Sequence, residues 1–265
     1  MHWQGVALGY FSYLALVSLT RREFTKARPW LLIAALAAWV SFAVFGAAAL
    51  SSTVKIVVPA LILLTGYWLS GLLFVRPDVR VERWLGSVDH TVLTRSGVLL
   101  WFRQASILVT EFFELSYLLV YAAVPAGATT LALAGHADQI DRFWTIVLLA
   151  EFACYGMLPW IQTRPPRVFE TEIVRPSRCP PIRRFNRGIG DRASIQANTI
   201  PSGHAAGAIA TALAVGSSMP IAGAMFLFLA ISIAVATVLG RYHYLIDTVL
   251  GVIVAVVAWL VVGGQ

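Results

Sequence analysis

The sequence predicts an all-α membrane protein, a polytopic helix bundle with about eight transmembrane helices. Of its 265 residues, 58% are hydrophobic and only 12% are charged, and its mean hydropathy is +0.76. These values lie outside the range of soluble globular domains. The apolar residues also fall into separate runs of about 20 residues, the length that a helix needs to cross the hydrocarbon core of a bilayer.

Eight apolar runs supply the expected helices, and they occupy residues 4–20, 30–50, 56–75, 106–134, 143–162, 203–219, 220–240 and 243–263. The first run has no basic segment before it and no small-residue cleavage site after it, so we expect a retained helix instead of a signal peptide. Residues 76–103 mix Val, Leu and Trp with arginines. This mixture fits an amphipathic segment along the lipid headgroups and a solvated loop equally well.

The charge and the cysteines exclude several other classes of protein. The formal charge of +7 comes from 20 Lys and Arg residues that lie almost wholly between the apolar runs. Membrane topology explains that pattern better than a nucleic-acid surface does, so we expect no nucleic-acid partner. Cys154 and Cys179 have neither a disulfide nor a metal-ligand spacing. We predict no metal ion and no cofactor.

Two polar clusters lie beside the apolar runs, Pro201-Ser202-Gly203-His204 and Arg241-Tyr242-His243-Tyr244-Leu245-Ile246-Asp247. Between them, two apolar helices turn at residues 216–220, and two crossings return the chain to the side that it left. An arginine-rich segment, residues 163–200, leads into the first cluster, and a loop of this length in a compact protein is usually functional or disordered. We therefore predict that His204, His243 and this loop share one membrane face, which holds the active site.

The residue types in these clusters fit phosphate chemistry. A helix that begins at Gly203 and His204 presents free backbone N–H groups and its positive dipole end, and the Ser202 hydroxyl can donate to an anion there. His243 and Asp247 stand four residues apart, so the carboxylate can orient the imidazole as a nucleophile or base. A helix cap or a satisfied polar pair explains either cluster alone. The two together, with a basic loop on the same face, favour a site.

Three segments resemble the signature motifs of the type 2 phosphatidic acid phosphatase superfamily, namely Arg164-Pro165, Pro201-Ser202-Gly203-His204 and His243-x3-Asp247. Members of that superfamily are membrane-embedded, metal-independent lipid phosphatases and phosphotransferases. The flanking residues look most like the bacterial branch related to inositol phosphorylceramide synthases. The motifs cover residues 164–247, and residues 1–75 are not matched. We divide the chain into N-terminal transmembrane helices with an interfacial segment, residues 1–105, and a catalytic phosphatase-like core, residues 106–265.

The resemblance implies that His243 attacks phosphorus to form a phosphohistidine, that Asp247 orients it and that His204 protonates the departing alcohol. We expect the substrate to be a lipid phosphate or diphosphate in the membrane. The acceptor is either water, as in a phosphatase, or a lipid or sugar hydroxyl, as in a phosphotransferase. The alternative is a phospholipid-binding or transport protein that keeps the anion site without turnover. The oligomeric state is left open.

The resemblance also implies that the phosphoryl oxygens are held by Arg164, Ser202 and Gly203. The chain departs from the family pattern at Met157, where the first motif has Lys, and at Thr237, where the third has Arg. Two phosphate-binding cations are therefore missing. Arg241 and Arg167 are the candidates to replace them, and other arginines of the long loop are the alternative.

Three further acids and the topology complete the predictions. Glu111 and Glu114 share a helix face and either pair with loop arginines at the site or lie at the headgroups, and Glu151 lies within an apolar run. We leave these acids out of the catalytic set. Every Lys and Arg except Lys55 and Arg142 lies on the predicted side of the site, which would place it in the cytoplasm. The resemblance implies an extracytoplasmic site in a bacterial inner membrane, and we expect that placement.

Overall fold

The computed structural model describes residues 2–45, 51–169 and 181–263, and within these ranges the chain is a helix bundle without a strand. The α-helices are α1 (Trp3–Thr20), α2 (Arg28–Phe45), α3 (Ser52–Gly71), α4 (Val79–Asp89), α5 (Val98–Gln104), α6 (Ile107–Leu118), α7 (Val120–Leu133), α8 (Ile140–Gly156), α9 (Pro181–Arg192), α10 (Gly203–Gly216), α11 (Pro220–Leu239) and α12 (Leu245–Val261). The predicted all-α fold is therefore confirmed. Cys179 and two of the loop arginines, Arg175 and Arg178, lie outside the described residues.

Each predicted apolar run contains a helix, but run 106–134 contains two. Helices α6 and α7 meet at Leu119 with a bend of 59°. By length and composition, residues 53–71 of α3 and all of α11 are suited to cross a bilayer, as is the α6–α7 pair if it counts as one span. Helices α2, α10 and α12 are apolar but shorter. A membrane helix bundle is thus supported, and the number of eight spans stays a prediction.

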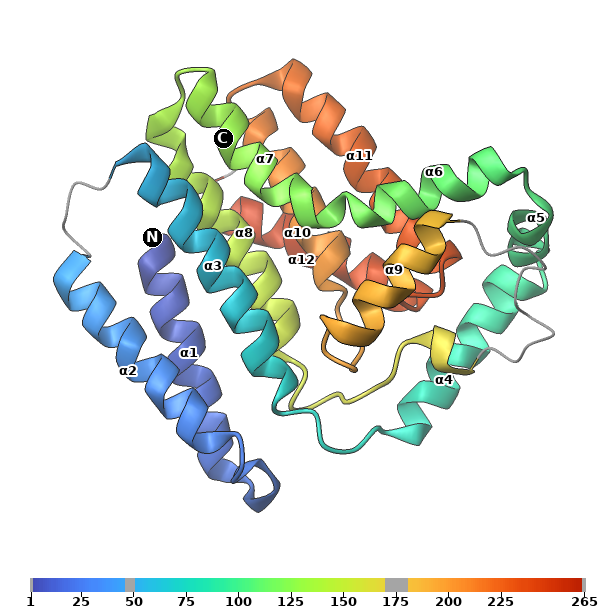
Figure 1. The fold of residues 1–265 in the computed structure, drawn as a ribbon, viewed down its shortest axis with the longest axis horizontal. Coiled ribbons are helices and arrows are strands. Elements are labelled where there is room, and N and C mark those ends of the chain that lie inside the picture. Colours follow the sequence, from blue (N-terminus) through green and yellow to red (C-terminus); the bar gives the residue numbers. More distant parts are fainter. Residues whose placement is uncertain (1, 46–50, 170–180, 264–265) are drawn as a thin grey trace.

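Helices α8 and α10 form the centre of the bundle (Figure 1). Helix α10 packs against α7, α8, α11 and α12, and α1 and α3 pack against the other side of α8. Close approach of α10 and α11 depends on Gly216 and Gly223, because a Cβ atom on Gly223 would overlap the Gly216 backbone. The N-terminal helices share this core, so the predicted division at residue 105 marks no gap in packing.

The segment 76–103 is helical, with α4 and α5 joined by one π-helical turn at His90–Thr94. Leu85 and Leu93 point inward while Trp84 is exposed, which is the pattern of an amphipathic helix. Its position relative to lipid headgroups stays a prediction. Two acids of α4, Glu82 and Asp89, are buried, and both contact the site described below.

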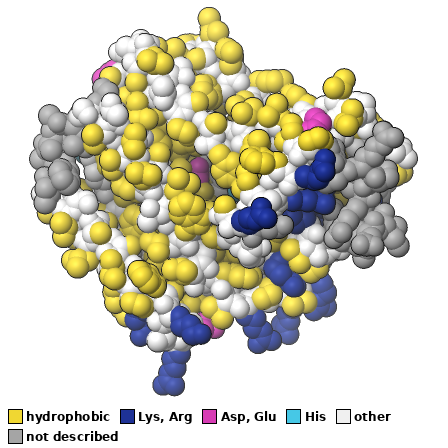
Figure 2. Space-filling view, viewed as in Figure 1, with side chains coloured by type: hydrophobic (Ala, Val, Ile, Leu, Met, Phe, Trp, Pro, Cys, Tyr) yellow, Lys and Arg dark blue, Asp and Glu magenta, His cyan; other side chains and the backbone are white. Residues whose placement is uncertain are grey.

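The two ends of the bundle differ in charge. Lys55 at the start of α3 lies 2.7 Å from Asp141 at the start of α8, and Arg142 donates to the carbonyl of Gly263 after α12. The other end carries the α1–α2 turn, α4 and α9. Figure 2 shows that Lys and Arg side chains on this face gather toward its lower part and right side, while hydrophobic side chains cover most of the rest.

Candidate active site

The two predicted histidines lie side by side. His204 is in the first turn of α10, and His243 is in the loop between α11 and α12. The Nε2 atom of His243 lies 3.4 Å from the Nδ1 atom of His204, and the ring centroids are 5.3 Å apart. The predicted convergence of His204 and His243 is therefore confirmed.

Asp247 lies directly behind His243. Its Oδ2 atom is 3.7 Å from His243 Nδ1, which is slightly longer than a hydrogen bond. The same oxygen accepts hydrogen bonds from the Asn198 amide at 2.8 Å and from the backbone N–H of Tyr244 at 3.0 Å. Asp247 is fully buried. These bonds fix the carboxylate so that it can orient the imidazole and stabilise a positive charge on it.

His243 is held in its neutral form. Burial lowers the pKa of His243 to about 3, and the positive charge of Arg167 contributes to the decrease. A neutral imidazole has one nitrogen with a free lone pair, which a nucleophile needs. At neutral pH the ring is therefore ready to attack an electrophile.

Asn198 connects the three motif segments. Its amide nitrogen donates to Asp247 and, at 3.1 Å, to the Thr163 hydroxyl, and its backbone N–H donates to the Thr163 carbonyl at 2.7 Å. The backbone N–H of Ser202 donates to the Asp247 carbonyl at 2.8 Å. Asn198 was not among the predicted site residues, although it precedes the Pro-Ser-Gly-His cluster by only three positions.

The start of α10 is already hydrogen-bonded within the protein. The Ser202 side chain caps the helix by accepting from the N–H of Ala205, and the Gly203 N–H donates to the Thr199 hydroxyl at 3.3 Å. Gly203 also has no room for a side chain, because a Cβ atom would overlap the Tyr155 ring. The predicted phosphate-binding roles of Ser202 and Gly203 are not tested by these contacts.

Arg164, the first-motif arginine, is paired with Glu82 of α4. Its Nε and Nη2 atoms donate to the two Glu82 oxygens at 3.0 and 2.9 Å, and its backbone N–H adds a third bond at 2.8 Å. Burial raises the pKa of Glu82, but the Arg164 hydrogen bonds and charge outweigh it, so the pKa is lowered. The bidentate geometry holds the guanidinium in one orientation.

Arg241 is paired in the same way with Asp89, seven residues further along α4. The Nη1 atom of Arg241 lies 2.5 Å from Asp89 Oδ2, and the other Asp89 oxygen accepts from the N–H of Leu245 at 3.0 Å. Two turns separate Glu82 from Asp89, so one face of α4 supplies both acids. Sequence reasoning missed them because acids in an arginine-rich amphipathic helix usually face water.

Arg167 is the predicted substitute cation whose charge acts on the histidines. Its backbone N–H donates to the Arg241 carbonyl at 3.0 Å, and its guanidinium lies 5.6 Å from the centre of the Tyr242 ring. Gly190 of α9 leaves space for this guanidinium. Arg167 is therefore better placed than Arg241 to meet a phosphoryl group at His243.

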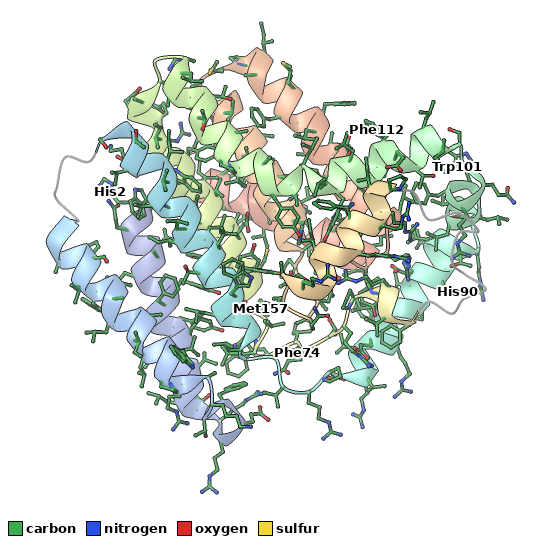
Figure 3. The ribbon with its side chains drawn as sticks, in the orientation of Figure 1. His2, Phe74, His90, Trp101, Phe112 and Met157 are labelled. Atoms are coloured by element: carbon green, nitrogen blue, oxygen red, sulfur yellow. The ribbon has the colours of Figure 1, made fainter. Side chains whose placement is uncertain are left out.

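Of the two positions that depart from the family pattern, Thr237 has a structural explanation and Met157 has none. Thr237 is buried, and its carbonyl accepts the N–H groups of Tyr242 and His243 at 2.9 and 3.0 Å. Its hydroxyl lies 3.1 Å from that of Thr248 on α12. Met157 is partly exposed just after α8, in the lower half of the view in Figure 3. Thr237 thus shapes the His243 loop.

An aromatic wall links His204 to Glu114. Tyr117 stacks on His204 with centroids 5.4 Å apart and on Tyr242 at 3.7 Å, and the Tyr242 hydroxyl donates to Glu114 at 2.7 Å. The bend between α6 and α7 lets Tyr121 meet the edge of the same imidazole at 6.1 Å.

Glu114 also anchors helix α9. Asn186 donates to its side chain and to its carbonyl, both at 2.8 Å, and Arg183 lies 3.5 Å from its second oxygen. Of the two alternatives for Glu114, the structure shows the pairing with a loop arginine. Glu111 has a buried oxygen with no hydrogen-bond partner among the described residues.

A pocket of about 580 Å³ reaches His204 from the side. Helices α3, α7, α8 and α9 contribute its walls, and most of the lining is apolar. The lining includes Leu63, Trp68, Val124, Pro125, Glu151 and His204. An apolar cavity that ends at His204, which contacts His243, fits a ligand with a hydrocarbon part and a polar end.

Comparison with known families agrees with this geometry, because the family model described as the PAP2 superfamily matches residues 79–261. The chain belongs to the PAP2 superfamily. Membership supports a phosphatase-type activity on phosphate esters. No curated protein and no solved structure matches the chain, so the predicted branch of the PAP2 superfamily is not tested. Among the described residues, no group of three or more His, Cys, Asp or Glu side chains is arranged to hold a metal ion.

Replacing Asn198 with Ala should lower kcat about 10- to 100-fold and change KM little. The variant loses the bonds that orient Asp247 behind His243, and a lost buried hydrogen bond costs about 1–3 kcal/mol. Phosphate release from a lipid phosphate is the measurement. Asn186→Ala is the matched control, since it also removes a buried Asn but does not contact Asp247. Equal kcat losses in the two variants would contradict the role of Asn198.

Arg167→Ala should reduce kcat/KM by about 100-fold or more, and Arg241→Ala by clearly less. Removing a charge that stabilises the transferring phosphoryl group has an effect of this size. Arg241 instead contacts Asp89, so its loss should mainly lower the thermal unfolding midpoint. Arg184→Ala on the exposed side of α9 serves as the control. If Arg241→Ala is the more damaging variant for turnover, the assignment of these two arginines is reversed.

Proposed function

We propose that this chain is a membrane lipid phosphatase or phosphotransferase that works through a phosphohistidine at His243. The observation that carries the proposal is the contact between His243 and His204 at the end of an apolar pocket, with Asp247 behind His243. Simple phosphate binding needs cations more than it needs an oriented, neutral imidazole. The arrangement therefore favours turnover over binding alone.

In the first step, the Nε2 lone pair of His243 forms a bond to phosphorus as the bond from phosphorus to the leaving oxygen breaks. The leaving oxygen takes the electron pair and a proton from His204, which must enter this step as the imidazolium and leaves it neutral. Asp247 stabilises the positive charge that develops on the His243 ring. Because Nε2 now faces the His204 ring at 3.4 Å, a bound phosphoryl group must take the place of that direct contact.

In the second step, the oxygen of water or of an alcohol attacks phosphorus and gives its proton to His204. The bond from phosphorus to nitrogen breaks, and its electron pair returns to the His243 ring. Arg167 is the cation that we assign to the phosphoryl oxygens, together with Arg164, Ser202 and Gly203. For Arg164 this role requires that Glu82 release or share its guanidinium.

The pocket supports a lipid as the substrate. Its apolar walls between α3 and α7 suit an acyl or alkyl chain, and the basic side chains around α9 suit a phosphate headgroup. The hydrocarbon chain of the lipid would then enter the pocket from the side, within the membrane.

A labelled phosphoryl group should be trapped on His243. The full-length protein is incubated with lipid phosphates and diphosphates labelled at phosphorus, and the denatured chain should carry an acid-labile, alkali-stable label. His243→Asn should carry none, while His90→Ala, at the outer end of α4 (Figure 3), should match the wild type. Release of free phosphate identifies water as the acceptor, and formation of a new phosphodiester identifies an alcohol. Tight lipid binding without label or product for the whole panel would support the alternative, a binding or transport protein.

We further propose an extracytoplasmic site in a bacterial inner membrane. The positive charges at this end then belong to substrate binding, although the positive-inside rule favours the opposite orientation. In intact cells, a Cys introduced at Arg187 should react with a membrane-impermeant maleimide, and one introduced at Lys55 should react only after lysis. The reverse pattern would place the site in the cytoplasm.

A further inference from the structure

One carboxyl group lies in the apolar pocket beside the histidine pair. Glu151 of α8 is only 7% exposed, and it is the one acidic side chain among the described residues that line the pocket. A buried carboxyl group in a membrane helix is costly, so such residues are usually functional. The mechanism above does not use Glu151.

Contact with α10 determines where the Glu151 carboxyl group lies along the pocket. Its carboxyl group packs against Gly207, where a Cβ atom would overlap the Oε1 atom. Gly207 is three residues beyond His204, so the carboxyl group lies about 4.5 Å further along the helix axis than the histidine backbone. A hydrogen-bond donor within a few bonds of a phosphoryl group at His243 could therefore reach the carboxyl group.

Only one oxygen of Glu151 accepts a hydrogen bond from a described residue. The Tyr155 hydroxyl donates to Oε2, and no described residue donates to Oε1. Tyr155 itself packs against Gly203 and, edge to face, against Tyr67 at 5.4 Å. The carboxyl group therefore keeps acceptor capacity toward a ligand in the pocket.

We propose that Glu151 is a specificity-determining residue that accepts a hydrogen bond from the lipid. The donor is a hydroxyl or amide N–H close to the phosphate ester, as on the second carbon of a glycerol phosphate. This inference rests on the proposed function only in assuming that the phosphoryl group binds at His243. A site built to accept such a bond discriminates against an analogue without the donor, because the buried carboxyl group is then left unpaired.

Binding to a chain that cannot turn over tests the inference. In a His243→Ala background, dissociation constants are measured for a 1-alkyl glycerol 3-phosphate and for its 2-O-methyl ether, in lipid nanodiscs. The two lipids differ only in the donor at the second carbon. The free hydroxyl should bind about tenfold more tightly, in line with one buried hydrogen bond.

Two variants in the same background separate a ligand role from a structural one. Glu151→Leu should abolish the preference, and Glu151→Gln, which keeps the shape and should fold, should reduce it. Tyr155→Phe removes the internal partner but keeps the carboxyl group, so the preference should persist. Equal binding of the two lipids in the parent, or an unchanged preference in both Glu151 variants, would overturn the inference.

A different result would contradict the proposed function. If the chain with His243 intact releases no phosphate and forms no phosphodiester, turnover is refuted, while the binding preference remains measurable. Glu23→Gln, an exposed acid after α1, is the control for loss of negative charge, and it should keep the wild-type preference.

Discussion

The active end of this bundle depends on one buried amide. Asn198 joins Thr163, which precedes the first-motif arginine, to Asp247, which lies behind the third-motif histidine. Three segments that are far apart in the sequence meet at this side chain, and both of its amide hydrogens are used. A side chain without two donors cannot hold both partners at once. One polar side chain therefore joins motifs that are far apart in the sequence.

Helix α4 adds a second constraint, because it holds two arginines in fixed positions. Each carboxylate pairs with a guanidinium from a different motif segment, so α4 ties the arginine loop to the His243 loop. The pairs also reduce the positive charge that the site presents before a ligand binds. A phosphate must therefore compete with Glu82 for Arg164. Arg167, in contrast, makes no carboxylate contact with the residues that the structure describes. This difference makes Arg167 the central cation of our proposal.

The sequence was sufficient for the fold class and for the meeting of His204 with His243, because apolar run length and two crossings determine the side of the membrane. It was not sufficient for the partners of the arginines. Glu82 and Arg164 are 82 positions apart, and no periodicity links them. The bend at Leu119 was missed for a similar reason, since no Gly or Pro marks the break itself. Span number, orientation and the roles of Ser202 and Gly203 stay predictions.

The backbone at Arg241 has a consequence for engineering. Its φ angle is 62°, in the left-handed region that glycine adopts without a steric penalty and other residues adopt at a cost of about 1–2 kcal/mol. A glycine there would relax the main chain while removing the partner of Asp89. Arg241→Gly therefore combines two effects of opposite sign on stability. A nearly unchanged melting temperature would not mean that the guanidinium contributes nothing.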